Sequence, residues 1–322
     1  MTENAINSVT ANRFAEKAIV ISSGLALFSG IVGLIIALDV PPDALQGNIF
    51  RLIFLHVPAS WMSLLIYLAM AIFSGCALAY GSRRRTDISA VFHMLAAAFT
   101  PTGAMFTLLT LMTGAYWGKH AWGTWWVWWD PRLVSELILL FMYLGLIALR
   151  KLSDNPVRAD KATALFSLVG VVNIPIVYFS VRWWNTLHQG YSITASKAPS
   201  MAPASFYGIL FCFLACLMYG AAVSLMRFRN IILIHKNNPD LIIESTCNTS
   251  PKNLLGQAGI IVVIIACAFL FAETLSFRSF LNSSMELILT PMTAALLFIF
   301  LLEPLFLKMR RSQIITRIRT LY

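Results

Sequence analysis

The chain has 322 residues, of which 58% are hydrophobic and only 12% are charged, with a mean hydropathy of +0.75. Soluble domains carry charge on roughly a quarter of their residues, so this composition excludes an ordinary soluble domain and predicts a membrane protein. The net charge of +10 does not indicate nucleic-acid binding, because cationic residues collect in the cytoplasmic loops of membrane proteins. We therefore expect no nucleic-acid partner. The five cysteines form no C-x-x-C pair, so we predict neither a disulfide framework nor a thiol redox site.

Eight apolar runs are near the length that crosses a bilayer as a helix, which is about 20 residues. The first follows a polar start and shows no small-residue cleavage pattern, so we expect an uncleaved first helix. Lipid requires each segment to satisfy its own backbone hydrogen bonds, so the sequence predicts an all-α, polytopic transmembrane bundle. The expected spans are 18–38, 53–80, 90–115, 133–149, 162–181, 204–226, 254–272 and 286–307.

The chain divides into a core and an appendage. Residues 1–235 hold six spans, and we interpret them as one core with an outer aromatic loop at 117–132. Residues 236–253 are polar and indicate a cytoplasmic linker, and 254–322 form a two-span C-terminal appendage with a basic tail. Prolines inside spans are expected only to bend the helices locally. They are Pro101, Pro175 and Pro291.

The distribution of Lys and Arg predicts the orientation. Alternate loops, counted with both termini, carry 18 of the 24 cationic residues, and the remaining loops carry 6. This asymmetry predicts that both termini are cytoplasmic and that the aromatic loop lies outside.

Six of the nine tryptophans lie within thirteen residues, in the segment WGKHAWGTWWVWWDPRLVSE. An interfacial aromatic belt is the simpler interpretation, but a belt needs only one or two tryptophans per helix end. Trp61, Trp183 and Trp184 are predicted on the same outer side, so all nine gather there. The six in the segment are Trp117, Trp122, Trp125, Trp126, Trp128 and Trp129.

Two histidines share the predicted outer side. His56 starts the second span in RLIFLHVPASW, and His188 follows the fifth span in RWWNTLHQGYS. Pro58 favours an extended Val57 and then a first helical turn, so His56 is expected at a helix mouth. A single histidine there is more often a polar cap than a ligand, but two beside tryptophans favour a binding site.

Haem needs both features, because its iron accepts axial histidines and its flat apolar ring suits aromatic enclosure. Its propionates need cations, for which Arg51, Arg132 and Arg182 are candidates, with snorkelling to lipid headgroups as the alternative. Asp130 is predicted to cap the fourth span, in front of Pro131.

The remaining polar residues carry weaker expectations. Glu136 is expected to pair with Arg132 on one helix face. His120 is a third possible haem contact or a polar loop residue. His93 and His235 are predicted on the cytoplasmic side, where neither should bind the same iron.

The segment WGTWWVWWD followed by PRLVSELILLFMYLG resembles the tryptophan-rich WWD signature of haem-handling membrane proteins. HVPASWMS around His56 and VNIPIVYFSVRWWNTLHQG around His188 resemble the two histidine segments of the CcmC family, the haem-handling component of system I cytochrome c maturation. The resemblance covers about residues 17–226, with three motifs in the same order.

The resemblance implies that haem b is held transiently on the outer face by the WWD segment, with His56 and His188 as axial iron ligands. It implies delivery to a CcmE-like, membrane-anchored chaperone that takes up the haem covalently through its own histidine. A CcmA/CcmB-like ABC transporter pair and a CcmD-like single-span subunit are the other implied partners. The transporter pair would hydrolyse ATP to release the loaded chaperone, and this chain has no G-x-x-x-x-G-K-[ST] motif. We therefore expect a haem-transfer protein without enzymatic activity in a bacterial inner membrane, or alternatively in a mitochondrial inner membrane.

Two features depart from the family pattern. The family reads WGTWWVWD, whereas both Trp128 and Trp129 precede the aspartate here, so the register of the last aromatic contacts is open. Family members usually end soon after the sixth span, whereas this chain continues to residue 322. One hypothesis is that the appendage replaces the single-span subunit or part of its docking surface.

Three other functions compete with haem transfer. A haem lyase of the WWD family would attach haem itself, but the two histidine segments resemble the handling protein. A channel or transporter would carry buried polar residues at mid-span, and the spans carry few. An electron-transfer protein with permanently bound haem remains open.

Overall fold

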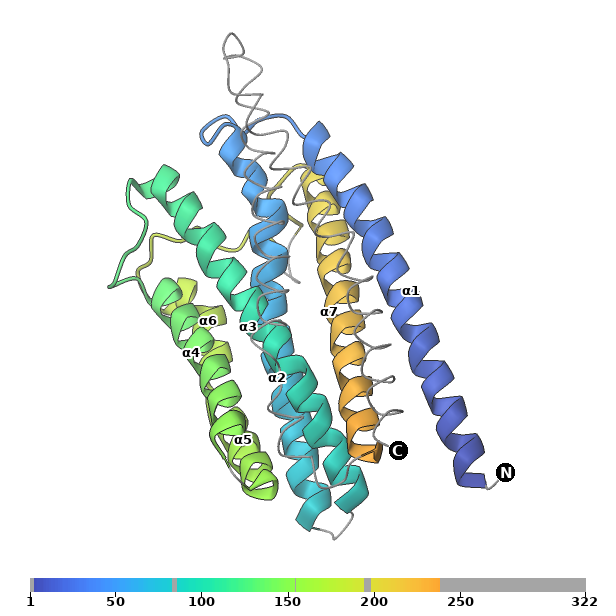
Figure 1. Cartoon of the computed structure of the whole chain (residues 1–322). Helices are drawn as coiled ribbons and strands as arrows, with labels where there is room; N and C mark the ends of the chain where they lie inside the picture. Colours follow the sequence, from blue (N-terminus) through green and yellow to red (C-terminus); the bar gives the residue numbers. More distant parts are fainter. Residues whose placement is uncertain (1–2, 83–85, 154, 194–197, 238–322) are drawn as a thin grey trace, which may run out of the picture. The chain divides into compact units, whose positions relative to one another are not determined.

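The structure is a computed structural model that describes residues 3–82, 86–153, 155–193 and 198–237. These residues are almost entirely helical, and they contain no strand beyond an isolated bridge between Asp43 and Gly47. The predicted appendage at 254–322, and all but the start of the predicted linker, lie outside the described residues. In chain order (Figure 1), the elements are α1 (Glu3–Asp39), a short 3-10 helix η1 (Asn48–Leu52), α2 (Ile53–Ser82), α3 (Thr86–Trp122), α4 (Pro131–Leu152), α5 (Pro156–Gly170), α6 (Asn173–Trp183) and α7 (Pro203–Asn237).

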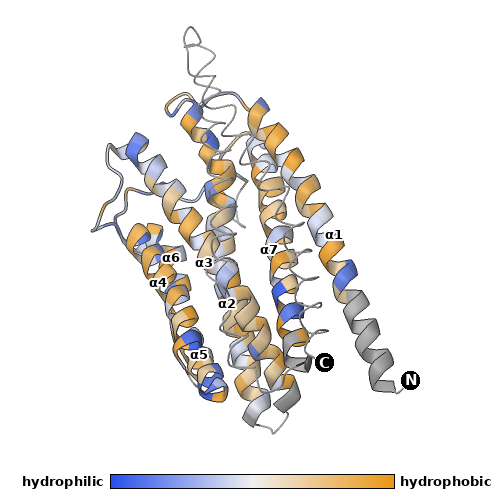
Figure 2. Ribbon diagram, viewed as in Figure 1, coloured by the Kyte–Doolittle hydropathy of each residue, from blue (hydrophilic) through white to orange (hydrophobic). Residues whose placement is uncertain are grey.

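Six stretches of the described helices are long and apolar enough to cross a membrane, and they coincide with the first six predicted spans. Large apolar side chains such as Ile21 and Phe28 lie exposed on the outer face of α1, where lipid replaces water as their solvent. Figure 2 shows that hydrophobic residues also predominate along the other helices, with the most hydrophilic residues mainly near helix ends. The predicted polytopic helical bundle is therefore confirmed for these six spans.

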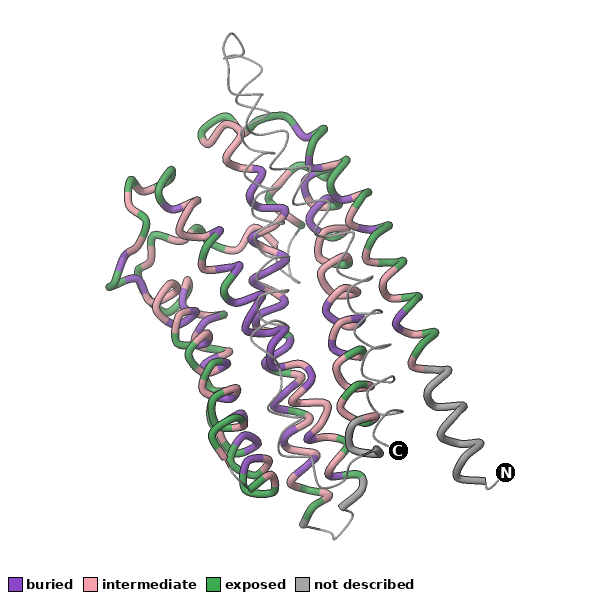
Figure 3. The backbone as a smooth tube through the Cα atoms, in the orientation of Figure 1, coloured by how far each residue is buried: buried purple, intermediate pink, exposed green. Residues whose placement is uncertain are grey.

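Helix α2 forms the centre of the bundle. It packs along α3 and also contacts α7 and α5, whereas α1 packs along α7. Buried residues accordingly concentrate on α2 and α3 (Figure 3). Tyr143 of α4 is fully buried and donates a hydrogen bond from its hydroxyl to the Ser63 carbonyl of α2 at 2.8 Å. A Cβ at Gly103 of α3 would lie 2.2 Å from the Tyr143 ring, so this close packing requires glycine.

The fifth span is one crossing built from two helices. Pro175 has no N–H and cannot continue the helical ladder, so α5 ends at Gly170 and α6 begins at Asn173. Between them, the Ile174 N–H bonds to the Val171 carbonyl at 3.0 Å, a three-residue spacing in place of four. The α-helical hydrogen bonding is therefore interrupted just before Pro175, although Val171 and Val172 keep right-handed helical dihedral angles. The local bend at Pro175 stays a prediction.

Two predicted boundaries near the candidate site are wrong. Helix α3 continues to Trp122, so the aromatic loop is 123–130 and is shorter than the predicted 117–132. Val57 is helical and not extended, because η1 leads directly into α2 and the helix is already established when the chain reaches Pro58. Pro58 has no N–H to donate to the Phe54 carbonyl, and α2 nevertheless continues through it to Ser82.

Candidate functional site

His56 lies near the start of α2, with its side chain buried against α3. Its Nδ1 lies 2.9 Å from the Thr113 Oγ1, and that hydroxyl donates its own proton to the Leu109 carbonyl at 2.7 Å. The Thr113 oxygen must therefore accept from His56, which places the imidazole proton on Nδ1 and leaves a lone pair on Nε2. A Cβ at Gly114 would lie 2.9 Å from the His56 ring, so the glycine makes room for the imidazole.

His188 lies on the loop between α6 and α7 and is half-buried. Its Nδ1 lies 2.8 Å from the Gln189 carbonyl, which only accepts, so the proton is on Nδ1 and Nε2 again carries the lone pair. Burial lowers the pKa of His188 to about 4, and the nearby Arg132 guanidinium acts in the same direction. The imidazole is therefore neutral at neutral pH, the form that binds metals.

The imidazoles of His56 and His188 lie close together. Their ring centroids are 6.4 Å apart, and their planes are tilted by 34°. Imidazole nitrogens bind metal ions at about 2.0–2.1 Å, so two rings on opposite sides of one ion have centroids roughly 6 Å apart. The predicted pair is thus brought together from residues 132 positions apart in sequence, at a separation that fits one ion.

The tryptophans of the aromatic segment divide into two groups. Trp117, on the last turns of α3, packs edge-on against His56 at 5.8 Å and donates its indole N–H to the Gln46 side chain. Trp122 and Trp126 are half-buried. In contrast, three indoles of the 123–130 loop are exposed, namely Trp125, Trp128 and Trp129.

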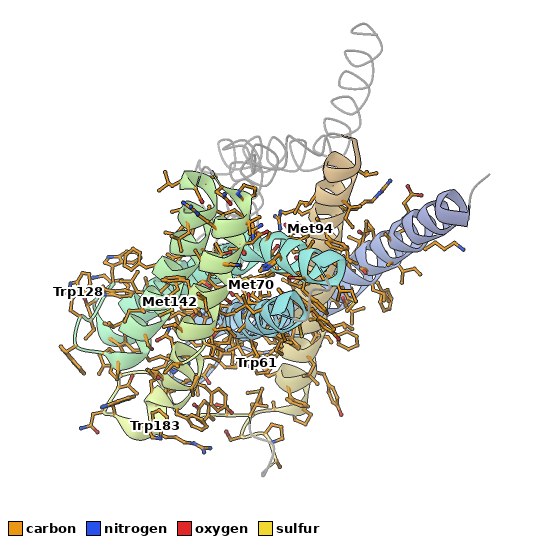
Figure 4. All side chains as sticks on the ribbon, turned by 90° about the horizontal axis from the view of Figure 1, so that it is seen from below. Trp61, Met70, Met94, Trp128, Met142 and Trp183 are labelled. Carbon is orange, nitrogen blue, oxygen red and sulfur yellow. The ribbon has the colours of Figure 1, made fainter. Side chains whose placement is uncertain are left out.

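Two further indoles extend this exposed aromatic surface. Trp183 and Trp184 at the end of α6 are exposed, and the Trp183 ring stacks on Phe179 at 5.0 Å. Figure 4 shows Trp128 and Trp183 at the periphery of the same side of the bundle. Trp61 is different, because it packs at 5.2 Å against Phe213 of α7 within the helix bundle.

Asp130 connects the aromatic loop to the His188 loop. It is fully buried, and its Oδ1 caps α4 by accepting from the backbone N–H groups of Arg132 and Leu133. Its Oδ2 accepts from the Thr186 hydroxyl at 2.6 Å and from the Leu187 N–H at 2.8 Å. The predicted cap is confirmed, and the carboxylate has a second, unpredicted role in holding the loop.

The three candidate arginines differ in their surroundings. Arg51 donates to the Ala37 and Val40 carbonyls and therefore fixes the C-terminal end of α1. Arg132 donates to the Val177 carbonyl of α6 at 2.6 Å and to the Ser60 hydroxyl of α2 at 2.9 Å. Only Arg182 is exposed, with its guanidinium 5.0 Å from the centre of the Tyr191 ring.

The expected pair between Glu136 and Arg132 is not formed. The Arg132 guanidinium points to Val177 and Ser60, and Glu136 instead accepts from the Ser63 hydroxyl at 2.7 Å. Helical spacing placed the two charges on one face, but partners on α2 and α6 supply better-placed hydrogen bonds.

The other histidines do not join the pair. His120 is exposed on the last turn of α3, with its Nδ1 3.0 Å from the Tyr116 carbonyl. His93 lies in the N-terminal half of α3, whereas Thr113, the partner of His56, lies in its C-terminal half, and His93 lines a cavity with Arg150 and Ser167. The His235 side chain lies outside the described residues.

Sequence reasoning missed several residues beside the pair. Thr113, Gly114 and Thr186 position the histidines, and no local motif marks them. Tyr191 follows three residues after His188, and its hydroxyl is buried without a hydrogen-bond partner among the described residues. The Trp126 indole N–H is also buried without a partner there. Such donors mark a place where a bound group is able to complete the hydrogen bonding.

Fold and site together define a multi-pass α-helical membrane protein with two neighbouring imidazoles and several exposed tryptophans. The protein-family model described as CcmC, heme exporter protein C, matches residues 1–242. The chain therefore belongs to the CcmC family.

Curated relatives come from bacteria and from a plant. A protein named heme exporter protein C from Escherichia coli K12 is 43% identical over 194 residues, covering 60% of this chain and 75% of the relative. A protein of the same name from Bradyrhizobium diazoefficiens is 40% identical over 202 residues, covering 63% and 74%. A Marchantia polymorpha protein named putative cytochrome c biosynthesis ccmC-like mitochondrial protein is 49% identical over 154 residues, covering 48% and 61%.

Proposed function

We propose that this protein binds haem b transiently between His56 and His188 and delivers it to a CcmE-like, membrane-anchored chaperone for cytochrome c maturation. Membership of the heme exporter protein C family, and relatives named for haem export and cytochrome c biosynthesis, support the haem-handling role. At the level of residues, the observation that carries the proposal is the imidazole pair, 6.4 Å apart, with both Nδ1 atoms engaged in hydrogen bonds.

The pair suits an iron ion because each neutral ring offers an Nε2 lone pair. A hydrogen bond from the distal N–H of a ligating histidine fixes its tautomer and orients the ring, and here Thr113 and Gln189 supply the acceptors. A flat apolar macrocycle also needs aromatic surroundings. Trp117 lies directly against His56, and the exposed indoles extend the surface outwards.

Polar groups around the pair suit the haem propionates. Arg182 is the proposed partner for a carboxylate, because its guanidinium is exposed and makes a cation–π contact with Tyr191. The unpartnered Tyr191 hydroxyl and Trp126 N–H are further donors. Arg132 and Arg51 act in this proposal by holding the surrounding helices, through the carbonyls and the hydroxyl they bind.

The exposed aromatic surface supports transient binding. Trp125, Trp128 and Trp129 remain accessible on the 123–130 loop, so a partner is able to approach haem bound beside them. We propose that the CcmE-like chaperone approaches here, with a CcmA/CcmB-like transporter pair and a CcmD-like subunit as the other partners. The excess of Lys and Arg in alternate loops supports placing this surface on the outer face of a bacterial inner membrane.

Absorption spectra of the purified protein test the ligands. We expect a six-coordinate, b-type haem spectrum in the wild type, weakened in His56→Ala and in His188→Ala and restored towards wild type by added imidazole. His120→Ala is the matched control, because this exposed histidine lies at the same end of the bundle. Undiminished haem in the double variant His56→Ala/His188→Ala would show that the ligands lie elsewhere. Absence of haem from every protein would overturn the haem proposal.

Coexpression tests delivery. With the chaperone and the transporter pair present, we expect covalent haem on the chaperone, and the double variant should abolish it. Attachment of haem to a C-x-x-C-H peptide by this chain alone would contradict the transfer role and favour a lyase.

A further inference from the structure

His188 has no helix to hold it, and its backbone is fixed through Thr186. The Thr186 Oγ1 accepts from the His188 N–H at 3.1 Å and donates to the Asp130 Oδ2 at 2.6 Å. The adjacent Leu187 N–H donates to the same carboxylate oxygen at 2.8 Å. The positions of three consecutive loop residues, 186–188, are therefore fixed by the side chain of Asp130, which belongs to the aromatic segment.

Asp130 is itself immobilised. Its other oxygen accepts two backbone N–H groups at the start of α4, and the residue is fully buried. A buried carboxylate with four donors is well satisfied, and its hydrogen bonds are of the stronger, charge-assisted kind. The start of α4 thus serves as the fixed point from which the His188 loop is held.

The His188 side chain has weaker support. Its Nδ1 bonds to the Gln189 carbonyl, which belongs to the same loop and moves with it. His56 differs, because its Nδ1 bonds to Thr113 on another helix, and its own backbone is part of α2. If the Thr186–Asp130 bond opens, the His188 N–H loses its connection to Asp130 and only the neighbouring Leu187 N–H still holds the loop to this carboxylate, whereas the attachment of His56 to α3 is unaffected.

We propose that Asp130 and Thr186 are positioning residues that latch His188 in place and make it the exchangeable one of the two ligands. This inference rests on the proposed function. In the step it describes, the bond between iron and the His188 Nε2 breaks, and a nitrogen of an incoming imidazole forms the new bond. Both imidazoles stay neutral, and no electron or proton changes place. Haem then leaves this protein with His56 as the last ligand to dissociate.

Variants at Thr186 separate the latch from general packing. Thr186→Val removes the hydroxyl at nearly constant volume, whereas Thr186→Ser keeps it, and Thr186→Ala is a second variant without the hydroxyl. In haem-free protein, hydrogen–deuterium exchange measures the Leu187 and His188 amides. We expect faster exchange in the valine and alanine variants and nearly wild-type protection in the serine variant. Equal protection in all of them would overturn the latch.

Ligand exchange tests the consequence for haem. Imidazole added to haem-loaded protein should replace an axial ligand about tenfold faster in Thr186→Val than in Thr186→Ser, the factor expected when a charge-assisted hydrogen bond is lost. Equal rates would overturn the proposal while leaving His188 as a ligand. A full wild-type spectrum in His188→Ala would instead overturn His188 ligation, and with it both the proposed site and this inference.

Discussion

His56 lies inside α2 and bonds to the neighbouring helix α3, whereas His188 lies on a loop that bonds to the Asp130 carboxylate through Thr186 and Leu187. The two rings are nevertheless only 6.4 Å apart. On the His56 side, position is set by helix packing, so Gly114 and Trp117 contact the ring directly. On the His188 side, position is set by hydrogen bonds between loops. The residues that fix it, Asp130 and Thr186, bond to the backbone of the loop and not to the imidazole ring.

The contrast has a functional meaning for a protein that must release what it binds. Packed helices are rigid because their side chains interdigitate closely, whereas a loop held by a few hydrogen bonds opens at lower free energy. A site with one fixed and one releasable ligand holds its substrate firmly and still lets it go.

Asp130→Ala should have the largest effect on stability. It removes the cap of α4 and leaves the Thr186 hydroxyl and the Leu187 N–H without an acceptor, so we expect a loss of about 2–4 kcal/mol in the free energy of unfolding. Denaturant unfolding in detergent measures it. Asp130→Asn is the control, because it keeps the size and one acceptor oxygen. A change of only a few tenths of a kcal/mol would contradict the role of Asp130 as the connection between the two loops.

Gly114→Ala should disturb the His56 side. The added Cβ lies 2.9 Å from the His56 Cε1, so the ring or the backbone of α3 must shift, at a cost of about 1–3 kcal/mol. We expect weaker haem retention that added imidazole restores. Gly190→Ala is a matched control on the His188 loop, where a Cβ meets no atom within 4 Å. Wild-type haem binding by Gly114→Ala would show that His56 does not need this space.

Thr113→Val should have a smaller effect on the same histidine. It removes the acceptor for the His56 Nδ1 proton but leaves the packing intact, so we expect about a tenfold loss of haem affinity, at the lower end of the range for such outer partners. Haem titration measures the affinity. Thr113→Ser retains the hydroxyl and should bind nearly as the wild type does. Equal affinity in the valine and serine variants would show that this hydrogen bond does not orient the ring.

Acidification should have the smallest effect on the His188 side. Burial lowers the pKa of His188 to about 4 from an ordinary value of 6.5. Between these two pH values the imidazole is therefore neutral in the folded chain but protonated in the unfolded chain. Stability from this group is fully present above pH 6.5 and falls as the pH drops from 6.5 towards 4. We expect constant His188 ligation between pH 7.5 and about 5. Absorption spectra measure the ligation, and unfolding curves of the wild type and of His188→Ala measure the stability. A loss of ligation centred near pH 6.5 would contradict burial of the ring.

Much of the site follows from short stretches of sequence. The pattern Asp130–Pro131 before an apolar run predicts an N-cap, and the structure has one. The six described spans follow from run length alone, because a bilayer imposes its thickness on each crossing. Predictions based on a single helix were less reliable. The Glu136–Arg132 pair was wrong because the two side chains bond to groups on other helices, Glu136 to Ser63 and Arg132 to Val177 and Ser60.

The sequence by itself determined that the chain crosses a membrane several times, since hydropathy depends only on local composition. It also determined which residues are chemically able to bind haem, because the clustered tryptophans and the two histidines beside tryptophans are visible in the sequence without any knowledge of the fold. Only the tertiary structure decided that the Nδ1 atoms of the two histidines are used in hydrogen bonds within the protein. It also decided that Thr113 bonds to the His56 ring, that Thr186 bonds to the His188 backbone, and that Asp130 links two loops. The Thr186–Asp130 and Thr113–His56 contacts join residues that are 56 and 57 positions apart in the sequence, and spacing along one helix carries no information about side chains that meet across the bundle.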